Sequence, residues 1–135
     1  MGYRSDVSFC IQIKDVEEFV ALMKVDNREI FRDFMRHMWI DDYKDDNGRG
    51  RLHFHCSGWK WYDESQAGLQ DLLDMADNFD NDYKAKLARV GEEPDDYEEE
   101  WWNDDDYELD APYVVRYVDT DFNKEKAKPV LEQGE

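Results

Sequence analysis

The residues with the clearest chemical potential are twelve carboxylates in one short segment. Between Gly91 and Asp110 the chain has twelve acidic residues and no Lys or Arg. They are Glu92, Glu93, Asp95, Asp96, Glu98, Glu99, Glu100, Asp104, Asp105, Asp106, Glu108 and Asp110. Carboxylates at such a density repel one another, and binding of a positively charged surface would relieve this repulsion. The pattern therefore predicts a segment that attracts a cationic partner surface.

Four aromatic residues are interleaved with these carboxylates, namely Tyr97, Trp101, Trp102 and Tyr107. A purely solvated linker usually lacks large aromatics, so we expect these rings to anchor the segment to the protein body or to a partner. Trp101 and Trp102 are the best candidates for partner anchors, because aromatic side chains dominate interface hot spots. The simpler alternative is a solvated loop whose charges only confer solubility.

Mimicry of a nucleic-acid backbone is one use for this charge, and its density can be compared with that of DNA. Duplex DNA carries one charge per ~1.7 Å. Twelve acids spread over twenty fully extended residues give only one charge per ~5.5 Å. The segment would therefore have to fold back on itself or combine with other acids, for which the sequence offers Asp71, Asp74, Asp77, Asp80 and Asp82.

Two other groups of residues invite a metal-binding interpretation. His53 and His55 lie on one face of a predicted strand, but a zinc site needs further ligands, and no Cys-x-x-Cys or His-x-x-x-His accompanies them. The stretch Asp77–Asp82 looks like a calcium loop, yet Asp82 stands where an EF-hand needs Gly and Ala88 where it needs Glu. We predict no metal and no cofactor, and expect exposed or helix-covered strand histidines.

Motifs of catalysis are missing from the sequence. The three histidines have no Gly-x-Ser-x-Gly, P-loop or dinucleotide glycine pattern near them. Carboxylate pairs are so abundant that they lose diagnostic value. We therefore predict a protein that is not an enzyme.

A basic row on a predicted helix, formed by Arg28, Arg32 and Arg36, recurs every four residues. Glu29 and Asp33 lie beside it, which is typical of an ion-paired solvent face. Alternatively, the row docks on the acidic segment of the same chain or of a second copy, and the latter would give a homodimer.

Hydrophobic periodicity predicts the elements that must position these residues. We expect strands at 7–13, 83–90 and 113–118, helices at 16–23, 30–38 and 69–76 with a break at 25–27, and a hairpin of 38–44 with 51–62 around Asn47-Gly48. Asp15 with Glu18 has the spacing of a helix cap. The fold class is α+β: a small mixed or antiparallel sheet of four to five strands with two or three helices packed on one face. Residues 1–122 form one domain with an acidic insertion at 91–110, and 123–135 form a loose polar tail.

Overall charge excludes some partners. The 135 residues carry a net charge of −18, of which residues 1–60 contribute −1 and residues 61–135 contribute −17. This charge argues against direct binding to nucleic acid or to an anionic membrane. The first residues lack a signal-peptide pattern and no long apolar run follows, so we expect a cytoplasmic protein with Cys10 and Cys56 reduced.

Three short motifs suggest an origin. Gly2-Tyr3-Arg4-Ser5-Asp6-Val7, Lys60-Trp61-Tyr62, and Val90-Gly91-Glu92-Glu93 followed by Asp95-Asp96 together resemble small, acidic, uncharacterised bacteriophage proteins. The resemblance spans the chain up to about Phe122 and implies expression in the cytoplasm of an infected bacterium, where such proteins often block host nucleases or defence complexes. It supplies no catalytic residues, and the Trp-rich stretch from Tyr97 to Asp110 departs from it.

Together these features predict a phage-encoded, non-enzymatic inhibitor of a host nucleic-acid-binding defence protein, of the anti-CRISPR or anti-restriction kind. The acidic, nucleic-acid-mimicking surface would occupy the partner's basic groove, while Trp101 and Trp102 would slow dissociation. The alternative is an acidic adaptor or regulator that binds proteins through its aromatic and sheet surface, with acidity serving solubility. A third hypothesis is a metal-dependent protein that uses His53 and His55.

Overall fold

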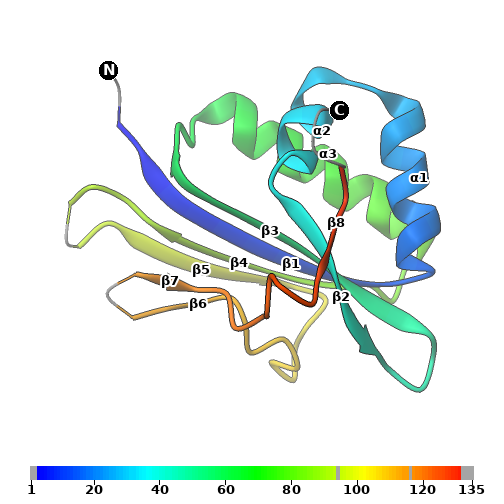
Figure 1. The fold of residues 1–135 in the computed structure, drawn as a ribbon. Helices are drawn as coiled ribbons and strands as arrows, with labels where there is room; N and C mark the ends of the chain where they lie inside the picture. Colours follow the sequence, from blue (N-terminus) through cyan, green and yellow to red (C-terminus); the bar gives the residue numbers. More distant parts are fainter. Residues whose placement is uncertain (1–2, 94, 116, 132–135) are drawn as a thin grey trace.

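A computed structural model describes residues 3–93, 95–115 and 117–131. Within these residues a six-stranded antiparallel sheet carries its helices on one face (Figure 1). The elements are β1 (Ser5–Lys14), α1 (Val16–Asp26), α2 (Glu29–Met35), β2 (Met38–Lys44), β3 (Arg49–Trp59), α3 (Asp63–Phe79), β4 (Lys84–Val90), β5 (Tyr97–Trp102), β6 (Tyr113–Val114), β7 (Val118–Asp119) and β8 (Lys128–Pro129). The predicted α+β class is confirmed, with slightly more strands than the four or five expected.

The strand order is β5-β4-β1-β3-β2-β8, with β1 and β3 at the centre. β1 pairs antiparallel with both β3 and β4, so that Phe9 lies opposite Phe54 on one side and Leu87 on the other. The four inner strands and their connecting helices have the split β-α-β arrangement of ferredoxin-like folds. β5 and β8 extend this sheet at its two edges.

Alternation along β1 builds the helix-covered face, as predicted for residues 7–13. Val7, Phe9, Ile11 and Ile13 are at most 1% exposed and point towards the helices. Phe9 stacks on Phe54 with ring centroids 4.7 Å apart. The hydrophobic core is therefore centred between β1, β3 and the three helices.

Helix boundaries follow the apolar pattern with three corrections. α1 ends at Asp26 and Asn27 adopts a left-handed φ of 57°, which confirms the predicted break. The second helix stops at Met35 because Met38 already belongs to β2, and α3 begins at Asp63 rather than at residue 69. Asp15 precedes α1, but its φ is 50° and its side chain makes no cap hydrogen bond, so the predicted capping arrangement is wrong.

The hairpin of β2 and β3 is confirmed at Asn47-Gly48. Gly48 has a φ of 81°, a conformation that glycine adopts without steric cost. The Asp45 carboxylate accepts hydrogen bonds from the backbone N–H groups of Asn47 and Arg49, at 2.9 and 2.8 Å. Side-chain bonding to the turn backbone thus helps to fix the register of the two strands.

The last third of the chain differs most from the prediction. Instead of one strand at 113–118, β6 and β7 pair with each other in a separate two-stranded sheet. Residues 123–131 are packed rather than loose, because β8 pairs with β2 and the apolar side chains of Ala127 and Val130 are buried. Residues 132–135 of the predicted tail lie outside the described residues.

We call residues 104–115 and 117–127 the C-terminal strap. The strap lies against the sheet face opposite the helices (Figure 1), where Leu109, Pro112 and Val118 are buried. The sheet is therefore covered on both faces. Among the described residues no helix is both long and apolar enough to span a bilayer.

Candidate functional site

Six of the twenty residues of the acidic segment, Tyr97–Trp102, form a strand of the main sheet rather than part of an insertion between strands. β5 pairs with β4 from Val90 opposite Tyr97 to Ala85 opposite Trp102. This pairing places the carboxylates of β5 and its flanks beside three cations of β4, namely Lys84, Lys86 and Arg89. Three positive charges thus offset part of the negative charge of the segment within the molecule.

Arg89 is the centre of the strongest of these clusters. Its guanidinium lies 2.6 Å from Asp96 and 2.7 Å from Glu98, and its side chain is 15% exposed. The Tyr3 hydroxyl donates a hydrogen bond of 2.6 Å to the same Asp96 carboxylate. Hydrogen bonds from Arg89 and then Tyr3 lower the pKa of Asp96 to about 2. The cluster ties the start of β5 to β4 and to the beginning of the chain.

Gly91 makes room for this cluster. Its N–H donates a 2.7 Å hydrogen bond to the carbonyl of Asp96. A Cβ atom at Gly91 would overlap the Asp96 carboxylate and the Tyr3 hydroxyl. The absence of a side chain at this position therefore has a packing reason.

Lys86 and Lys84 balance the carboxylates on the strap side of the sheet. Lys86 is 3% exposed; its Nζ lies 3.7 Å from Glu99 and donates to the carbonyl of Asp110 at 3.0 Å. Lys84 lies 3.2 Å from Glu108 and 3.6 Å from Asp104. These contacts bring the strap against β4.

Asp104 has a structural role. It is 2% exposed, and its two oxygens accept hydrogen bonds from the N–H groups of Glu108 and Leu109 at 2.7 and 2.9 Å. Its side chain therefore fixes the turn that leads from β5 into the strap, and it cannot face a partner. Five of the twelve predicted site carboxylates form ion pairs within the chain: Asp96, Glu98, Glu99, Asp104 and Glu108.

The two predicted aromatic anchors lie on opposite sides of β5. Trp102 is on the helix side and packs against the hydrophobic core. Trp101 is on the strap side, where it is 36% exposed, meets Tyr107 edge-on and lies below the Lys86 ammonium at 4.8 Å. Trp102 thus anchors β5 to its own protein, and Trp101 keeps more surface for a partner.

The other predicted site residues are arranged around β5 without forming one compact group. Exposed side chains are those of Glu92, Glu93, Asp95, Glu100, Asp105, Asp106 and Asp110. Of these, Glu92 accepts a 3.2 Å hydrogen bond from the N–H of Arg4. No ion pair in the described part of the chain involves any of the seven, so their charges are available to the solvent.

A groove of about 200 Å³ separates β5 from α3. Its lining is mixed: five residues are apolar or aromatic, namely Trp61, Leu69, Leu73, Leu87 and Trp102, and four are polar or acidic, namely Gln66, Gln70, Glu98 and Glu100. Partial burial, and then the nearby charge of Glu98, raise the pKa of Glu100. The groove thus combines aromatic surface with two adjacent carboxylates.

Acidic residues of α3 continue this surface. Asp63, Gln66, Gln70, Asp74 and Asp77 recur at three- and four-residue spacing and so form one stripe of the helix. Gln66 and Gln70 of this stripe line the groove, and Gln70 donates a 3.0 Å hydrogen bond to Asp74. We call Asp63, Asp74, Asp77, Glu98 and Glu100 the acidic ridge. Glu98 and Glu100 line the groove, and the three aspartates lie on the α3 stripe whose Gln66 and Gln70 line it; Asp74 also borders the groove between α1 and α3.

Three other acids that we expected to combine with the acidic segment, Asp71, Asp80 and Asp82, pair with arginines outside it. Asp80 is 8% exposed and forms a bidentate pair with Arg49, with contacts of 2.9 and 3.0 Å. Asp82 lies 3.8 Å from the same guanidinium. Asp71 pairs with Arg28 at 3.1 Å. The expected contributions of these three to a duplex-like charge array are therefore reduced by local pairing.

The basic row of α2 pairs locally. Arg28 contacts Asp26 at 2.7 Å as well as Asp71 of α3, and Arg36 contacts Asp33 at 2.7 Å. Within the described residues, neither of these arginines forms an ion pair with the acidic segment of its own chain. The arrangement agrees with the simpler interpretation of an ion-paired surface.

The predicted histidine pair lies on the strap side of β3. The expectation that His53 is exposed or covered by a helix is wrong. His53 is 4% exposed, and it is covered by Phe122 of the strap, whose ring stacks on the imidazole at 4.2 Å. Its Nε2 lies 2.5 Å from an Asp41 carboxylate oxygen. Burial alone would lower the pKa of His53, but the neighbouring Cys10 and Asp41 raise it to about 9. An imidazolium–carboxylate pair therefore lies beneath the strap.

Cys10, His53 and Asp41 have the residue types of a cysteine-protease triad. Cys10 is opposite His53 in the strand register but is fully buried, and Phe122 covers the imidazole. The Cys10 thiol is therefore closed to solvent in this arrangement. Within the described residues no group of three or more His, Cys, Asp or Glu side chains is placed to hold a metal ion.

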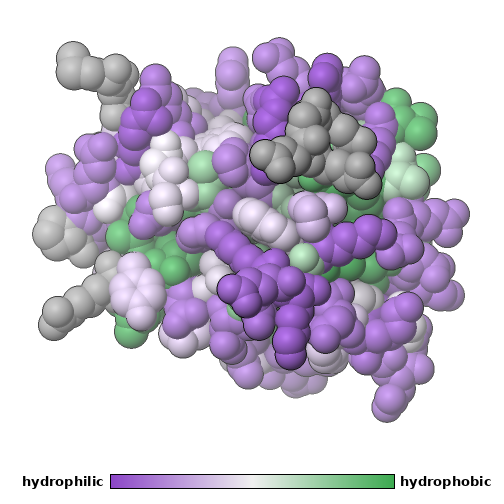
Figure 2. Space-filling view, in the orientation of Figure 1, coloured by the Kyte–Doolittle hydropathy of each residue, from purple (hydrophilic) through white to green (hydrophobic). Residues whose placement is uncertain are grey.

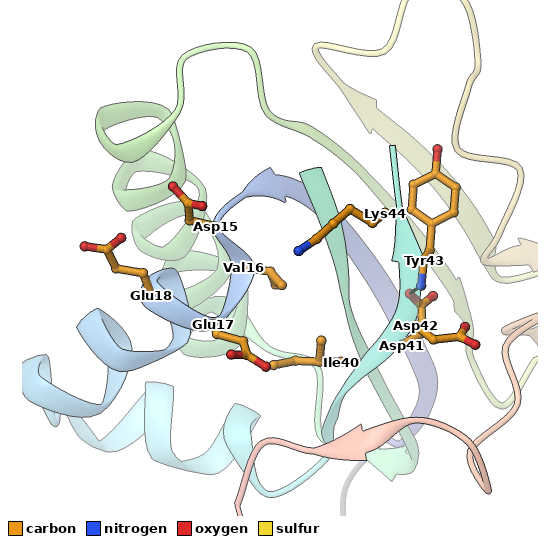
Figure 3. Close-up of a pocket in the computed structure, with 9 residues that line it drawn as sticks. All are labelled: Asp15, Val16, Glu17, Glu18, Ile40, Asp41, Asp42, Tyr43 and Lys44. Carbon is orange, nitrogen blue, oxygen red and sulfur yellow. Dashed lines mark hydrogen bonds between the residues drawn. The ribbon is translucent and has the colours of Figure 1, made fainter. Parts of the chain in front are cut away.

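A second acidic groove, of about 620 Å³, lies between the start of α1 and the outer part of β2 (Figure 3). Glu17, Glu18 and Asp42 border it, while Lys44 extends across it towards the start of α1. Its carboxylates come from two elements, the start of α1 and the outer part of β2. Acidic charge is thus present on more than one side of the protein, and Figure 2 shows hydrophilic residues over most of the face in view.

Sequence reasoning missed the cations of β4 and the groove between β5 and α3. Alternation of Lys84 and Lys86 in a strand that precedes an acidic run is a signal that could have indicated pairing between the two. The groove gives no such signal, because Trp61 and Trp102 are far apart in sequence. Comparison with protein-family models, curated proteins and solved structures yields no match for this chain.

Proposed function

We propose that this protein is a non-enzymatic inhibitor that occupies the basic, nucleic-acid-binding surface of another protein. The observation that carries the proposal is the acidic ridge. Four of its five carboxylates, those of Asp63, Asp74, Asp77 and Glu100, have no ion-pair partner among the described residues, and only Glu98 is paired, with Arg89. A net charge of −18 reinforces the field of this ridge.

Electrostatic attraction between the acidic ridge and a basic groove would drive such binding. A basic groove that binds nucleic acid does so largely by electrostatic attraction, so it also attracts a dense array of carboxylates. Because the β4 cations pair with five carboxylates of the acidic segment, of which only Glu98 belongs to the ridge, attraction for a cationic partner is concentrated on the carboxylates that remain unpaired. Association should therefore be fast and sensitive to salt.

The setting that we propose is that of a bacteriophage protein acting in the cytoplasm of an infected bacterium against an anti-phage nuclease or CRISPR complex. The resemblance of the Gly2–Val7 motif to small acidic phage proteins supports this setting. An acidic inhibitor would then act by competing with the nucleic acid for the same groove.

The alternative function is an adaptor that binds proteins. The sequence suggested the aromatic and sheet surface for this binding, but the structure leaves neither sheet face open, so an adaptor would need another surface. Both sheet faces are covered, one by helices and one by the strap. A shallow groove between α1 and α3 offers apolar surface from Leu22, Met75 and Phe79 instead, with Leu22 42% exposed, and Asp71 and Asp74 also border it. Binding through this groove would persist at high salt, whereas binding through the acidic ridge would not.

Capture from a nuclease-treated bacterial lysate at low salt, followed by elution with duplex DNA, tests the proposal. The immobilised protein should retain basic proteins that excess DNA displaces. A ridge variant with Asp63, Asp74 and Asp77 changed to Asn and Glu100 changed to Gln should lose this capture. The matched control changes Glu17 and Glu18 to Gln and Asp15 and Asp42 to Asn, which removes the same charge from the other groove.

Retention by the control and loss by the ridge variant would support the proposal. Equal retention by both variants would contradict it, because the ridge would then contribute nothing specific. Equal loss by both would also contradict it, since net charge alone would then explain the capture.

A further inference from the structure

The two edge strands of the main sheet, β8 and β5, differ in what lies beside them. At one edge β8 pairs with β2, through Trp39 opposite Pro129 and Ile40 opposite Lys128. At the other edge β5 pairs only with β4. Within the described residues no further strand pairs with the outer side of β5. An unpaired edge of this kind presents backbone donors and acceptors to a partner strand.

The hydrogen-bond phase of β5 can be read from its first pair. The N–H of Gly91 bonds to the carbonyl of Asp96, so Asp96 and every second residue after it direct their backbone groups towards β4. Glu98 and Glu100 belong to this inward set. Tyr97, Glu99 and Trp101 consequently direct their N–H and C=O groups outwards, away from the sheet.

The glutamate side chains of β5 point to opposite sides of the sheet and differ in their partners. Glu98 and Glu100 point to the α3 side, where they border the groove with Trp61 and Trp102. Glu99 points to the strap side and is already engaged by Lys86 and by the N–H of Val114, at 3.7 and 2.8 Å. Glu98 is paired with Arg89 at 2.7 Å, whereas Glu100 has no ion-pair partner among the described residues, so the unpaired negative charge of the edge is on the α3 side, at Glu100.

We propose that the β5 edge binds an extended basic segment of a partner protein, which adds to the sheet as an antiparallel strand. This inference rests on the proposed function and names the part of the partner that is recognised. Alternate Arg or Lys side chains of the added strand lie on the α3 side, opposite Glu98 and Glu100. Their aliphatic stems cover Trp102 and the groove, while smaller residues lie opposite Glu99 and Trp101.

Strand geometry favours this pairing for a specific reason. Because Glu98 and Glu100 direct their backbone groups towards β4, residues opposite them on an added antiparallel strand occupy non-hydrogen-bonded positions. Side chains are closest at such positions, which strengthens Glu–Arg contacts. The residues between them supply the backbone hydrogen bonds to Tyr97, Glu99 and Trp101.

A second copy of this protein is a poor occupant of the edge. In an antiparallel pairing of two β5 strands centred on Glu99, the three glutamates of one copy face those of the other. Like charges directly opposite one another destabilise a strand pair. Charge thus protects the edge against self-association and selects a basic segment.

Synthetic peptides test the inference directly. An eight-residue peptide of alternating Arg and Val, labelled for fluorescence polarisation at low salt, should bind the protein. N-methylation of the Val residues removes the N–H groups that face β5 and should weaken binding at least tenfold. N-methylation of the Arg residues removes outward N–H groups and should change affinity by less than about threefold.

A variant pair tests the charge component. Changing Glu98 and Glu100 to Gln should weaken peptide binding roughly tenfold, whereas changing Glu17 and Glu18 to Gln should leave it unchanged. Equal affinity of the two N-methylated peptides would overturn the inference, because binding would then depend on charge without strand addition. Loss only on Arg methylation would overturn it as well. Capture of DNA-displaceable proteins through the ridge could persist in either case, so failure here is distinguishable from failure of the proposed function.

Discussion

The two faces of the sheet are both closed, but by different chemistry. The helix side is covered by apolar side chains such as Phe9, Phe34 and Leu72, which are at most 1% exposed. The strap side buries polar groups, among them His53 and Lys86, each with an anionic or carbonyl partner. The comparison indicates that buried charge is tolerated where partners are built in, and we expect the strap side to depend more strongly on pH and ion pairing than the apolar core on the helix side.

Truncation of an aromatic residue on the helix side should have the largest effect on stability. Phe54 is fully buried, stacks on Phe9 and meets Phe34 edge-on. Phe54→Ala removes these contacts and leaves a cavity, so we expect a loss of about 3–5 kcal/mol in the free energy of unfolding. Urea unfolding followed by circular dichroism measures it. A loss below that of Phe122→Ala would reverse the comparison between the faces.

Alkaline pH should weaken only the strap side. The folded pKa of His53, about 9, exceeds its ordinary value of 6.5. The stabilisation from its protonation is thus complete below pH 6.5 and is lost as pH rises through 9. The loss amounts to roughly 3 kcal/mol.

Urea unfolding of the protein and of His53→Gln at both ends of this pH range measures the effect. His53→Gln should lack the alkaline decrease in stability. His55→Gln is the matched control and should keep it, because burial lowers the pKa of His55. An identical decrease in the His53 variant would assign it to another group.

Removing the cover from His53 should have a smaller effect than opening the apolar core. Phe122 is partly exposed and stacks on the imidazole at 4.2 Å. Phe122→Ala should cost about 1–2 kcal/mol, since a cation–π contact and partial burial are lost. It should also bring the pKa of His53 closer to 6.5, which NMR titration of the imidazole can follow. An unchanged titration would show that the ring contributes packing alone.

Salt should have the smallest effect and should act through the unpaired carboxylates. Added sodium chloride screens repulsion on the acidic ridge, so the melting temperature should rise by roughly 2–4 °C. The ridge variant with Asn and Gln substitutions should show a smaller rise when measured by differential scanning calorimetry. A rise of equal size in both proteins would place the repulsion outside the ridge.

Elements with strong periodicity were predictable from the sequence. The alternation from Val7 to Ile13 gave β1, and Asn47-Gly48 gave the hairpin, because these signals are local. β5 was missed because Glu98, Glu99 and Glu100 disfavour strands on their own. The pairing that stabilises them comes from cations of β4, which tertiary structure brings to the same place.

The candidate site was predictable in composition and less so in arrangement. The sequence identified the twelve carboxylates, but it could not show that Asp104 folds inwards or that Asp96 pairs with Arg89. It also could not show that Gln66 and Gln70, on the same α3 stripe as Asp74 and Asp77, line a groove shared with β5. These are consequences of contacts between residues distant in sequence.

Coverage of the strap side late in the chain has a consequence for synthesis on the ribosome. β1 and β3 can pair once residue 59 has emerged, but Phe122, which covers His53, follows more than sixty residues later. Until then the nascent chain exposes the face that carries Cys10 and the future imidazolium pair. A polypeptide arrested near residue 110 should therefore react with a thiol reagent at Cys10, whereas the finished protein should be protected.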